Sequence, residues 1–323
     1  MAMGFTRTRK EKEFQSQHFA GGRDHVALTS LARHVRRFAG APFSRRRRAL
    51  FECNFISSPV WCCRFSEELS RLRQGMGALT GKVVVVTGAS RGIGRATVER
   101  LAKDGASVVV NYATSAEEAD AVVEVIKTRG GEALAIQADI ARLEDIRRLF
   151  RETMERLEML DILVANAGYS CFKPMDEITE EDFDLTYRLN AKGTYFCLQE
   201  ALRHMVDGGR VVCISTIGTV LNVPGGTCYF GSKAAVEQFC RTLAKEIAPR
   251  GITVNVVSPG FTETVMLLAN MGADARRDFI EMTPLHRLGQ PEEISDVISF
   301  LVGEQGRWIN RQNIAADGGI ISR

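Results

Sequence analysis

Tyr229 and Lys233 lie four residues apart in the stretch CYFGSK, residues 228–233. In a helix this spacing puts both side chains on one face. A free phenol titrates near about pH 10, so a neighbouring ammonium is needed to favour phenolate character at neutral pH. The pair is therefore a candidate for proton transfer, although polar pairs at this spacing also occur by chance on ordinary helices.

A glycine-rich stretch, VVVVTGASRGIGRA, offers a second kind of chemistry through Gly88, Gly92 and Gly94. Glycine permits positive φ and lets backbone N–H groups approach a pyrophosphate, whose charge a following helix N-terminus stabilises. The spacing is G-x-x-x-G-x-G, between an apolar run and an amphipathic one. This strand–loop–helix context favours a dinucleotide site over a purely structural turn.

The end of the second apolar run indicates which dinucleotide binds. Folds that prefer NAD carry an acid there for the ribose 2′-hydroxyl, whereas VVVNYATS places Asn111 at that point. Arg91 in the glycine loop can reach a 2′-phosphate, and Thr114 and Ser115 can donate hydrogen bonds to it. NADP(H) is favoured over NAD(H); the alternative is that Arg91 simply faces solvent.

The elements that must position these groups alternate between β-branched runs and amphipathic stretches. This pattern predicts βαβ units, and nearly continuous apolar runs indicate strands covered on both faces. We predict strands at 82–88, 106–112, 132–138, 160–167, 210–216, 252–258 and 313–317, and helices at 92–104, 115–129, 142–158, 179–206, 228–248 and 291–303. The fold class is α/β, a single Rossmann-type doubly wound parallel sheet of about seven strands with helices on both faces. TSAEE and TEED offer N-caps.

Residues 260–283 form the longest stretch without a clear element. A loop of that length in a compact domain is more often functional than accidental, so we expect a mobile substrate lid there. Its apolar VMLLANM segment suggests an acyl or otherwise apolar substrate, and is equally consistent with an amphipathic packing helix.

The chain has 323 residues, 45% of them hydrophobic and 25% charged, as in a soluble globular protein. Its eight cysteines have no zinc or disulfide-framework spacing, and we expect no metal site. The longest apolar runs fall short of the roughly 20 residues that span a membrane, so no membrane contact is expected.

Residues 1–78 are basic, with 15 Lys and Arg against 6 Asp and Glu, whereas the remainder carries 27 against 33. We predict a disordered leader over residues 1–75 and one NADP-binding domain over 76–323. The leader fits a transit peptide, or upstream sequence translated ahead of a true start at Met76. We expect a cytoplasmic protein, or an organellar one (plastid or mitochondrion) if the leader is a transit peptide. The run Arg45–Arg48 is interpreted as solvated, so no nucleic-acid partner is expected.

Nine motifs occur in a fixed order over residues 78–323: TGASRGIG (87–94), the AD that ends at Asp139, ANAG (165–168), the asparagine of RLNAKG (190), the serine of CIST (215), YFGSK (229–233), NVVSPGFTET (255–264), LGQPEE (288–293) and DGG (317–319). Together they resemble the short-chain dehydrogenase/reductase family, in particular its 3-oxoacyl-[acyl-carrier-protein] reductase-like branch.

The resemblance implies a catalytic set. Tyr229 would donate a proton to the substrate carbonyl oxygen, and Lys233 would bind the nicotinamide ribose and lower the pKa of Tyr229. Ser215 would polarise the substrate oxygen, with the neighbouring Thr216 as a competitor; the S-x-x-G pattern through Gly218 favours Ser215. Asn190 would hold a water that links Lys233 to solvent.

The resemblance also implies cofactor contacts: Asp139 would contact the adenine or instead cap the helix that begins near Leu143, and Asn166 would line the nucleotide or cap its strand. The full expected set is Gly88, Ser90, Arg91, Gly92, Ile93, Gly94, Asn111, Ser115, Asp139, Ile140, Asn166, Ala167, Gly168, Tyr229, Lys233, Pro259, Gly260, Thr262 and Thr264.

Three departures from the family pattern stand out. Ala165 replaces the first of two paired asparagines, and we expect the nucleotide site to remain intact. Arg311 and His286 lie where the family tends to carry flexible turn residues. Arg311 puts the local backbone or a subunit contact in doubt, while His286 is expected to be solvated or packed rather than catalytic.

The function expected from these observations is NADPH-dependent reduction of a carbonyl, in a 3-oxoacyl thioester or a related ketone or aldehyde, to an alcohol. Oxidation of a sugar or polyol alcohol and a non-catalytic NADP(H)-binding scaffold are the alternatives. Family members pair through the helices that correspond to 179–206 and 228–248, so we expect a homodimer or homotetramer.

Overall fold

A computed structural model describes residues 77–269 and 273–321 of the chain. The predicted leader, residues 1–75, and the alternative start at Met76 lie outside the described residues, as does the basic run Arg45–Arg48. The fold and the site are therefore those of the predicted domain alone.

Seven parallel strands form one sheet in the order β3-β2-β1-β4-β5-β6-β7. All seven correspond to the predicted short apolar runs. The residues of β1, β4 and β6 are all buried, whereas those of the edge strands β3 and β7 are mostly only partly buried. Their bounds are β1 Val83–Val86, β2 Ser107–Tyr112, β3 Glu132–Gln137, β4 Leu160–Ala165, β5 Met205–Ile214, β6 Thr253–Pro259 and β7 Asn313–Ala316. The order reverses between β1 and β4, and ligands of such sheets bind outside the carboxyl ends of the strands at that point.

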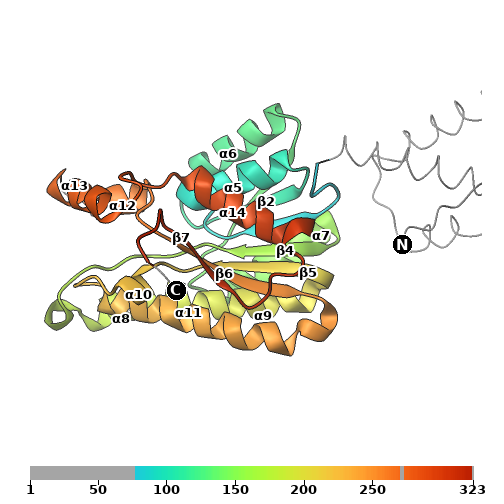
Figure 1. Cartoon of the computed structure of the whole chain (residues 1–323). Coiled ribbons are helices and arrows are strands. Elements are labelled where there is room, and N and C mark those ends of the chain that lie inside the picture. The colour runs from blue at the N-terminus through green and yellow to red at the C-terminus, as the bar shows by residue number, and fades with distance from the viewer. Residues whose placement is uncertain (1–76, 270–272, 322–323) are drawn as a thin grey trace, which may run out of the picture. The chain divides into compact units, whose positions relative to one another are not determined.

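Helices cover both faces of the sheet (Figure 1). One face packs on α5 (Gly92–Lys103), α6 (Ala116–Thr128) and α14 (Pro291–Val302), and the other on α7 (Leu143–Leu157), α9 (Thr194–His204) and α11 (Thr227–Glu246). The predicted Rossmann-type doubly wound sheet is confirmed. No helix in the described part of the chain is long and apolar enough to cross a membrane.

The predicted helix 179–206 is interrupted. It consists of α8 (Glu180–Tyr187), a π-helical turn, η2 (Arg188–Gly193), and α9. Thr179 caps α8 in a capping box with Asp182, as the TEED motif predicts. The π turn widens the backbone at Asn190, whose side chain bonds to the loop after β4 instead of facing a neighbouring turn.

We expected a loop after β6, but this segment contains two helices, α12 (Val265–Ala269) and α13 (Ala273–Met282). Phe261 stacks on Phe279 with ring centroids 4.0 Å apart, and Arg276 forms an ion pair with Glu263 at 3.0 Å. These two contacts join residues 261–263 to α13. Short elements that the sequence does not predict are η1 (Met175–Glu177), α10 (Gly218–Leu221), η3 (Ala248–Arg250) and η4 (Glu304–Gly306).

Arg311 and His286, two of the departures from the family pattern, both adopt left-handed backbone conformations, with φ of 64° and 51°. Such conformations cost a residue with a Cβ about 1–2 kcal/mol. At Arg311 the conformation is held by two bonds, from its backbone N to the Val254 carbonyl and from its Nε to the Arg241 carbonyl. His286 is exposed and makes no side-chain bond among the described residues.

We therefore expect His286→Gly to raise the free energy of unfolding by about 0.5–1 kcal/mol, because the relief of backbone strain exceeds the entropy that glycine adds to the unfolded chain. Urea unfolding measures this change. The control is Ala121→Gly, at an exposed alanine in the middle of α6, which should lower the same quantity by about 1 kcal/mol. A loss of stability in the His286 variant would contradict the expectation.

Candidate active site

The glycine loop between β1 and α5 has the geometry of a phosphate-binding loop. Gly88 and Gly92 adopt positive φ, at 62° and 55°. A Cβ on Gly94 would lie 2.3 Å from the Gly88 carbonyl oxygen and 2.6 Å from Nδ2 of Asn166. Each of the three glycines is therefore required by backbone conformation or by close approach.

Asn111, a predicted cofactor contact, anchors this loop to the end of β2 through bonds within the protein. Its Oδ1 accepts a bond from the Gly88 N–H at 3.2 Å, its carbonyl accepts the Ala89 N–H at 2.7 Å, and its Nδ2 donates to the Ala138 carbonyl at 3.0 Å. The side chain is 1% exposed, so it cannot reach a ribose phosphate. The residue that β2 presents at its end is the half-buried Tyr112, which is also not acidic.

The residues around the loop could bind a dinucleotide that carries a phosphate on its adenosine ribose. The first turn of α5 contains no acidic residue, and the cap residue Arg91 is exposed without an ion pair among the described residues. Ser115 begins α6 with its hydroxyl not used as a cap. Because Ala89 is bonded to Asn111, the loop that carries Arg91 is fixed beside the segment that carries Thr114 and Ser115.

Asn166 closes the loop from the side of β4. Its Nδ2 donates to the Thr87 and Gly88 carbonyls, both at 2.9 Å, while Thr87 Oγ1 accepts the N–H groups of Asn166 and Ala167 at 3.0 Å. These bonds agree with a strand-end cap, one of the two predicted roles. They also bring Ala167 within reach of the glycine loop, where a Cβ on Gly88 would lie 3.0 Å from its Cα.

Asp139 ends the segment after β3 and organises the turn before α7. Its Oδ1 accepts the Ala141 N–H at 2.9 Å, and its own N–H donates to Asp145 at 3.0 Å. Ile140 is buried, and its carbonyl oxygen would lie 2.4 Å from a Cβ on Gly193. Asp139 does not cap α7 as one prediction had it, because the N-cap position is Arg142, three residues later.

Lys233 is a buried cation at the carboxyl edge of the sheet. It lies in α11, is 4% exposed, and donates from Nζ to the Ile214 carbonyl at 2.9 Å. A Cβ on Gly168 would lie 3.1 Å from this Nζ, which explains the glycine after β4. Burial lowers the pKa of Lys233 to about 8 because desolvation disfavours the ammonium.

Tyr229 lies one helical turn before Lys233, as predicted. Its ring contacts Phe172 and Phe230, with centroid separations of 5.7 and 5.6 Å. Burial raises the pKa of Tyr229 to about 12, because desolvation disfavours the phenolate, and this direction is opposite to the lowering expected from Lys233. The phenol is thus held in its protonated form, which is the form that a proton donor requires.

Asn190 is completely buried in η2. Its Oδ1 accepts the Tyr169 N–H, and its Nδ2 donates to the Tyr169 carbonyl, both at 2.8 Å, and to Ser232 Oγ at 2.9 Å. Its Oδ1 would lie 3.4 Å from a Cβ on Gly168, on the same side as Lys233 Nζ. Both N–H groups of the amide and one lone pair of Oδ1 bond to protein groups, so Asn190 fixes the loop after β4 against α11.

Ser215 and Thr216 follow β5 directly. Ser215 is 3% exposed and bonds through Oγ to Oε1 of Glu237 at 2.8 Å, whereas Thr216 is half-buried. Glu237 is a buried acid that the sequence analysis missed. The signal was its position, one turn beyond Lys233 on the same helix face.

The Pro259–Gly260 turn after β6 borders the site on its other side. A Cβ on Gly260 would lie 2.7 Å from the Cα of Asp317, so this turn requires glycine. Thr262 is buried and donates to the Gly260 carbonyl at 3.1 Å, while Thr264 Oγ1 accepts the Leu267 N–H and caps α12.

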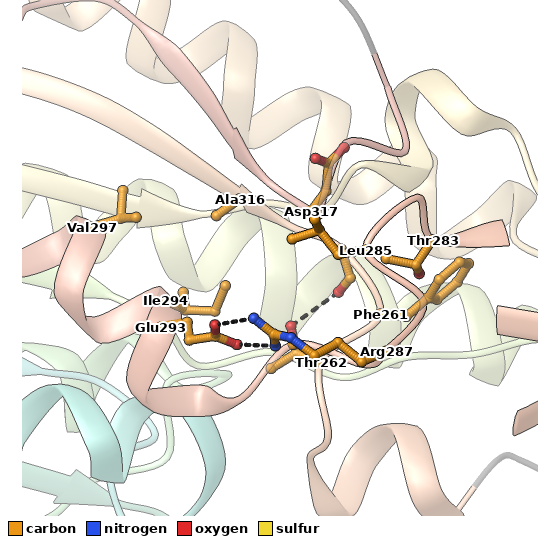
Figure 2. Close-up of a pocket in the computed structure, with 13 residues that line it drawn as sticks. Phe261, Thr262, Thr283, Leu285, Arg287, Glu293, Ile294, Val297, Ala316 and Asp317 are labelled. Carbon is orange, nitrogen blue, oxygen red and sulfur yellow. Dashed lines mark hydrogen bonds and ion pairs between the residues drawn. The ribbon is translucent and has the colours of Figure 1, made fainter. Parts of the chain in front are cut away.

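A cavity of about 230 Å³ opens beneath this turn (Figure 2). Phe261, Leu285, Ile294 and the paired Arg287 and Glu293 line it. None of the four predicted catalytic residues lines it, whereas two of the predicted cofactor contacts, Gly260 and Thr262, do.

The lowered pKa of Lys233 predicts a pH dependence of stability. Between pH 8 and 10.5 the unfolded chain retains a proton that the folded chain has released, so folding becomes more favourable as the pH rises through this window. The free energy of unfolding of the wild type should rise by up to about 3 kcal/mol relative to Lys233→Met. Urea unfolding at pH 7.5 and pH 10 measures it, with exposed Lys192→Met as the control. Equal changes in all three proteins would refute the assignment.

Comparison with known proteins places this geometry in a family. The sequence family described as enoyl-(acyl carrier protein) reductase matches residues 88–321. A hydroxynaphthalene reductase-like protein of Metarhizium guizhouense is 39% identical over 258 residues, covering 76% of this chain and 97% of that protein.

Two solved structures share the fold. A short-chain dehydrogenase from Burkholderia cenocepacia in complex with NADP is 40% identical, with a TM-score of 0.72 over 75% of this chain and 99% of its own. The angucycline C-6 ketoreductase LanV with bound NADP is 39% identical, with a TM-score of 0.73 over 76% and 97%. The chain is an NAD(P)-dependent oxidoreductase of the short-chain dehydrogenase/reductase family.

Proposed function

We propose that the protein reduces a carbonyl group to an alcohol with NADPH. The observation that carries the proposal is the pairing of a protonated, partly buried phenol, Tyr229, with a buried ammonium, Lys233, one helical turn apart. This pair lies at the edge of the sheet where the phosphate loop also ends. Bound nicotinamide would supply the hydride.

The chain's own groups provide the proton. Tyr229 donates its phenolic proton to the oxygen as negative charge develops there, so that no free alkoxide forms. Lys233, protonated below about pH 8, then offsets the charge left on the phenolate. Phe172 and Phe230 pack against the phenol and limit its contact with water.

The substrate class has two candidates. A 3-oxoacyl thioester is supported by the sequence motifs and by the description of the matching family. A planar aromatic ketone is supported by Phe172, whose ring contacts Tyr229 while the residue remains 45% exposed. The relatives described as hydroxynaphthalene reductase-like and angucycline ketoreductase support it too.

We expect Tyr229→Phe to lower kcat at least 1,000-fold without weakening NADPH binding, because the variant keeps the ring and loses only the proton. NADPH oxidation over a panel of 3-oxoacyl thioesters, polycyclic aromatic ketones and aliphatic aldehydes gives kcat, and fluorescence titration gives the Kd for NADPH. Full activity in the variant would overturn the mechanism. A wild type that binds NADPH and reduces nothing would favour a non-catalytic scaffold, and faster oxidation of sugar alcohols would reverse the proposed direction.

The cofactor proposal rests on Arg91. We expect wild-type kcat/KM to favour NADPH over NADH, and Arg91→Ala to lower the NADPH value about 10- to 100-fold while leaving the NADH value within twofold. A guanidinium–phosphate bond is of that strength, and NADH has no group for it. Arg95→Ala, at an exposed arginine one turn further along α5, is the matched control. An equal loss with both cofactors would contradict the role of Arg91.

A further inference from the structure

Phe172 is a half-exposed aromatic residue beside the proton donor. It lies in the loop after β4, and its ring contacts the ring of Tyr229 at a centroid distance of 5.7 Å and an interplanar angle of 49°. Large apolar side chains are usually buried, yet Phe172 is 45% exposed. Part of its ring is therefore free to contact a molecule that approaches Tyr229.

The backbone on both sides of Phe172 is held in place. Cys171 before it is buried, and the N–H of Lys173 after it donates to the Gly225 carbonyl at 3.0 Å. The Lys173 ammonium also forms an ion pair with Asp182 at 2.6 Å, and this carboxylate belongs to the capping box of α8. The loop thus presents Phe172 from a fixed backbone, and the charge of Lys173 is neutralised.

Phe230 supports the ring of Phe172. The two rings are 5.6 Å apart at 81°, an edge-to-face contact that aromatic pairs prefer. Phe230 itself fits between two glycines, because a Cβ on Gly218 would lie 2.0 Å from its ring and a Cβ on Gly226 would lie 2.2 Å from it. The start of α10 and the turn before α11 therefore confine Phe230, and Phe172 packs against a ring that has little room to move.

The surface around Phe172 is apolar. Tyr169 and Met175 in the same loop and Val220 on α10 are all exposed. A fixed aromatic ring in such surroundings favours a flat aromatic partner, because stacked or edge-to-face ring pairs gain energy beyond their buried area. A flexible acyl chain gains only the burial and loses the rotational freedom of its bonds.

We propose that Phe172 is a stacking surface that selects ketones whose carbonyl belongs to a planar, ring-fused aromatic molecule, in preference to 3-oxoacyl thioesters. The inference rests on the carbonyl reduction proposed above and names its substrate class. Phe172 contacts the body of the substrate and determines specificity, while Tyr229 supplies the proton.

Two ketones with one skeleton isolate the effect of aromaticity. 2-Tetralone has one aromatic ring, 2-decalone has the same fused rings saturated, and neither carbonyl is conjugated. Wild-type kcat/KM should be higher for 2-tetralone than for 2-decalone or a 3-oxobutanoyl thioester. Phe172→Leu keeps apolar bulk and loses the ring, so it should lower the 2-tetralone value about 5- to 10-fold, mainly through KM. The 2-decalone value should stay within about twofold, and Phe172→Tyr should restore the 2-tetralone value to within about threefold.

Phe183→Leu is the matched control. Phe183 is as exposed as Phe172 and stacks on Tyr187 with ring centroids 4.3 Å apart, but it lies on α8. Its replacement should leave kcat/KM for both ketones within about twofold. Titration of the NADP⁺-loaded protein with 2-naphthol measures binding without turnover, and its Kd should rise about 5- to 10-fold in Phe172→Leu. If Phe172→Leu does not fold, Phe172→Met replaces it in both measurements.

Equal losses with both ketones in Phe172→Leu would show that the ring only packs against Tyr229, and would overturn the inference. A wild type that reduces the thioester faster than 2-tetralone would refute the substrate class. Failure of the proposed function is a separate result, seen as full activity in Tyr229→Phe. If the wild type reduces no carbonyl, the 2-naphthol titration decides: a Kd that depends on Phe172 supports the stacking surface, and a Kd independent of it ends the inference as well.

Discussion

The buried ammonium of Lys233 is the constraint on which the carboxyl edge of the sheet depends. A cation inside a protein must be met by oxygen atoms and close packing, and here the Ile214 carbonyl accepts its bond. The effect extends outward: a side chain at residue 168 would crowd the ammonium, Asn190 holds the chain after β4, and the last carbonyl of β5 faces α11. Gly168, Asn190 and the end of β5 are thus arranged around the charge of the Lys233 ammonium.

The two halves of the site share an apolar core, and hydrogen bonds at the strand ends join them as well. Thr87 and Asn166 join the ends of β1 and β4, and Asn111 joins the glycine loop to β2. The backbone groups of the glycine loop are therefore positioned by buried polar side chains, which make their hydrogen bonds within the protein. This arrangement orients the loop by specific bonds, whereas apolar packing would allow several rotations.

The sequence predicts the sheet well because each strand is a short apolar run in a regular βαβ alternation, and the central strands β1 and β4 are completely buried. The sequence also predicts the glycine loop of Gly88, Gly92 and Gly94, and the placing of Tyr229 and Lys233 one turn apart on a helix. Both arrangements are set by local spacing along the chain. It does not predict that Asn111 turns inward, because strand-end orientation depends on one residue of register. Glu237 and the interrupted helix at Asn190 depend on partners 18 to 42 residues away, and α12 and α13 depend on contacts across their own segment.

The bond from Asn166 to the carbonyl of Gly88 spans 78 residues of chain. The phosphate loop therefore cannot take its final conformation from local sequence alone. Until β1 and β4 have paired at the centre of the sheet, Gly88 lacks its bond from Asn166. A ligand of the loop can bind only the folded chain and must, by mass action, stabilise the centre of the sheet. Cofactor concentration in the cell would then set how long this protein survives as well as how fast it works.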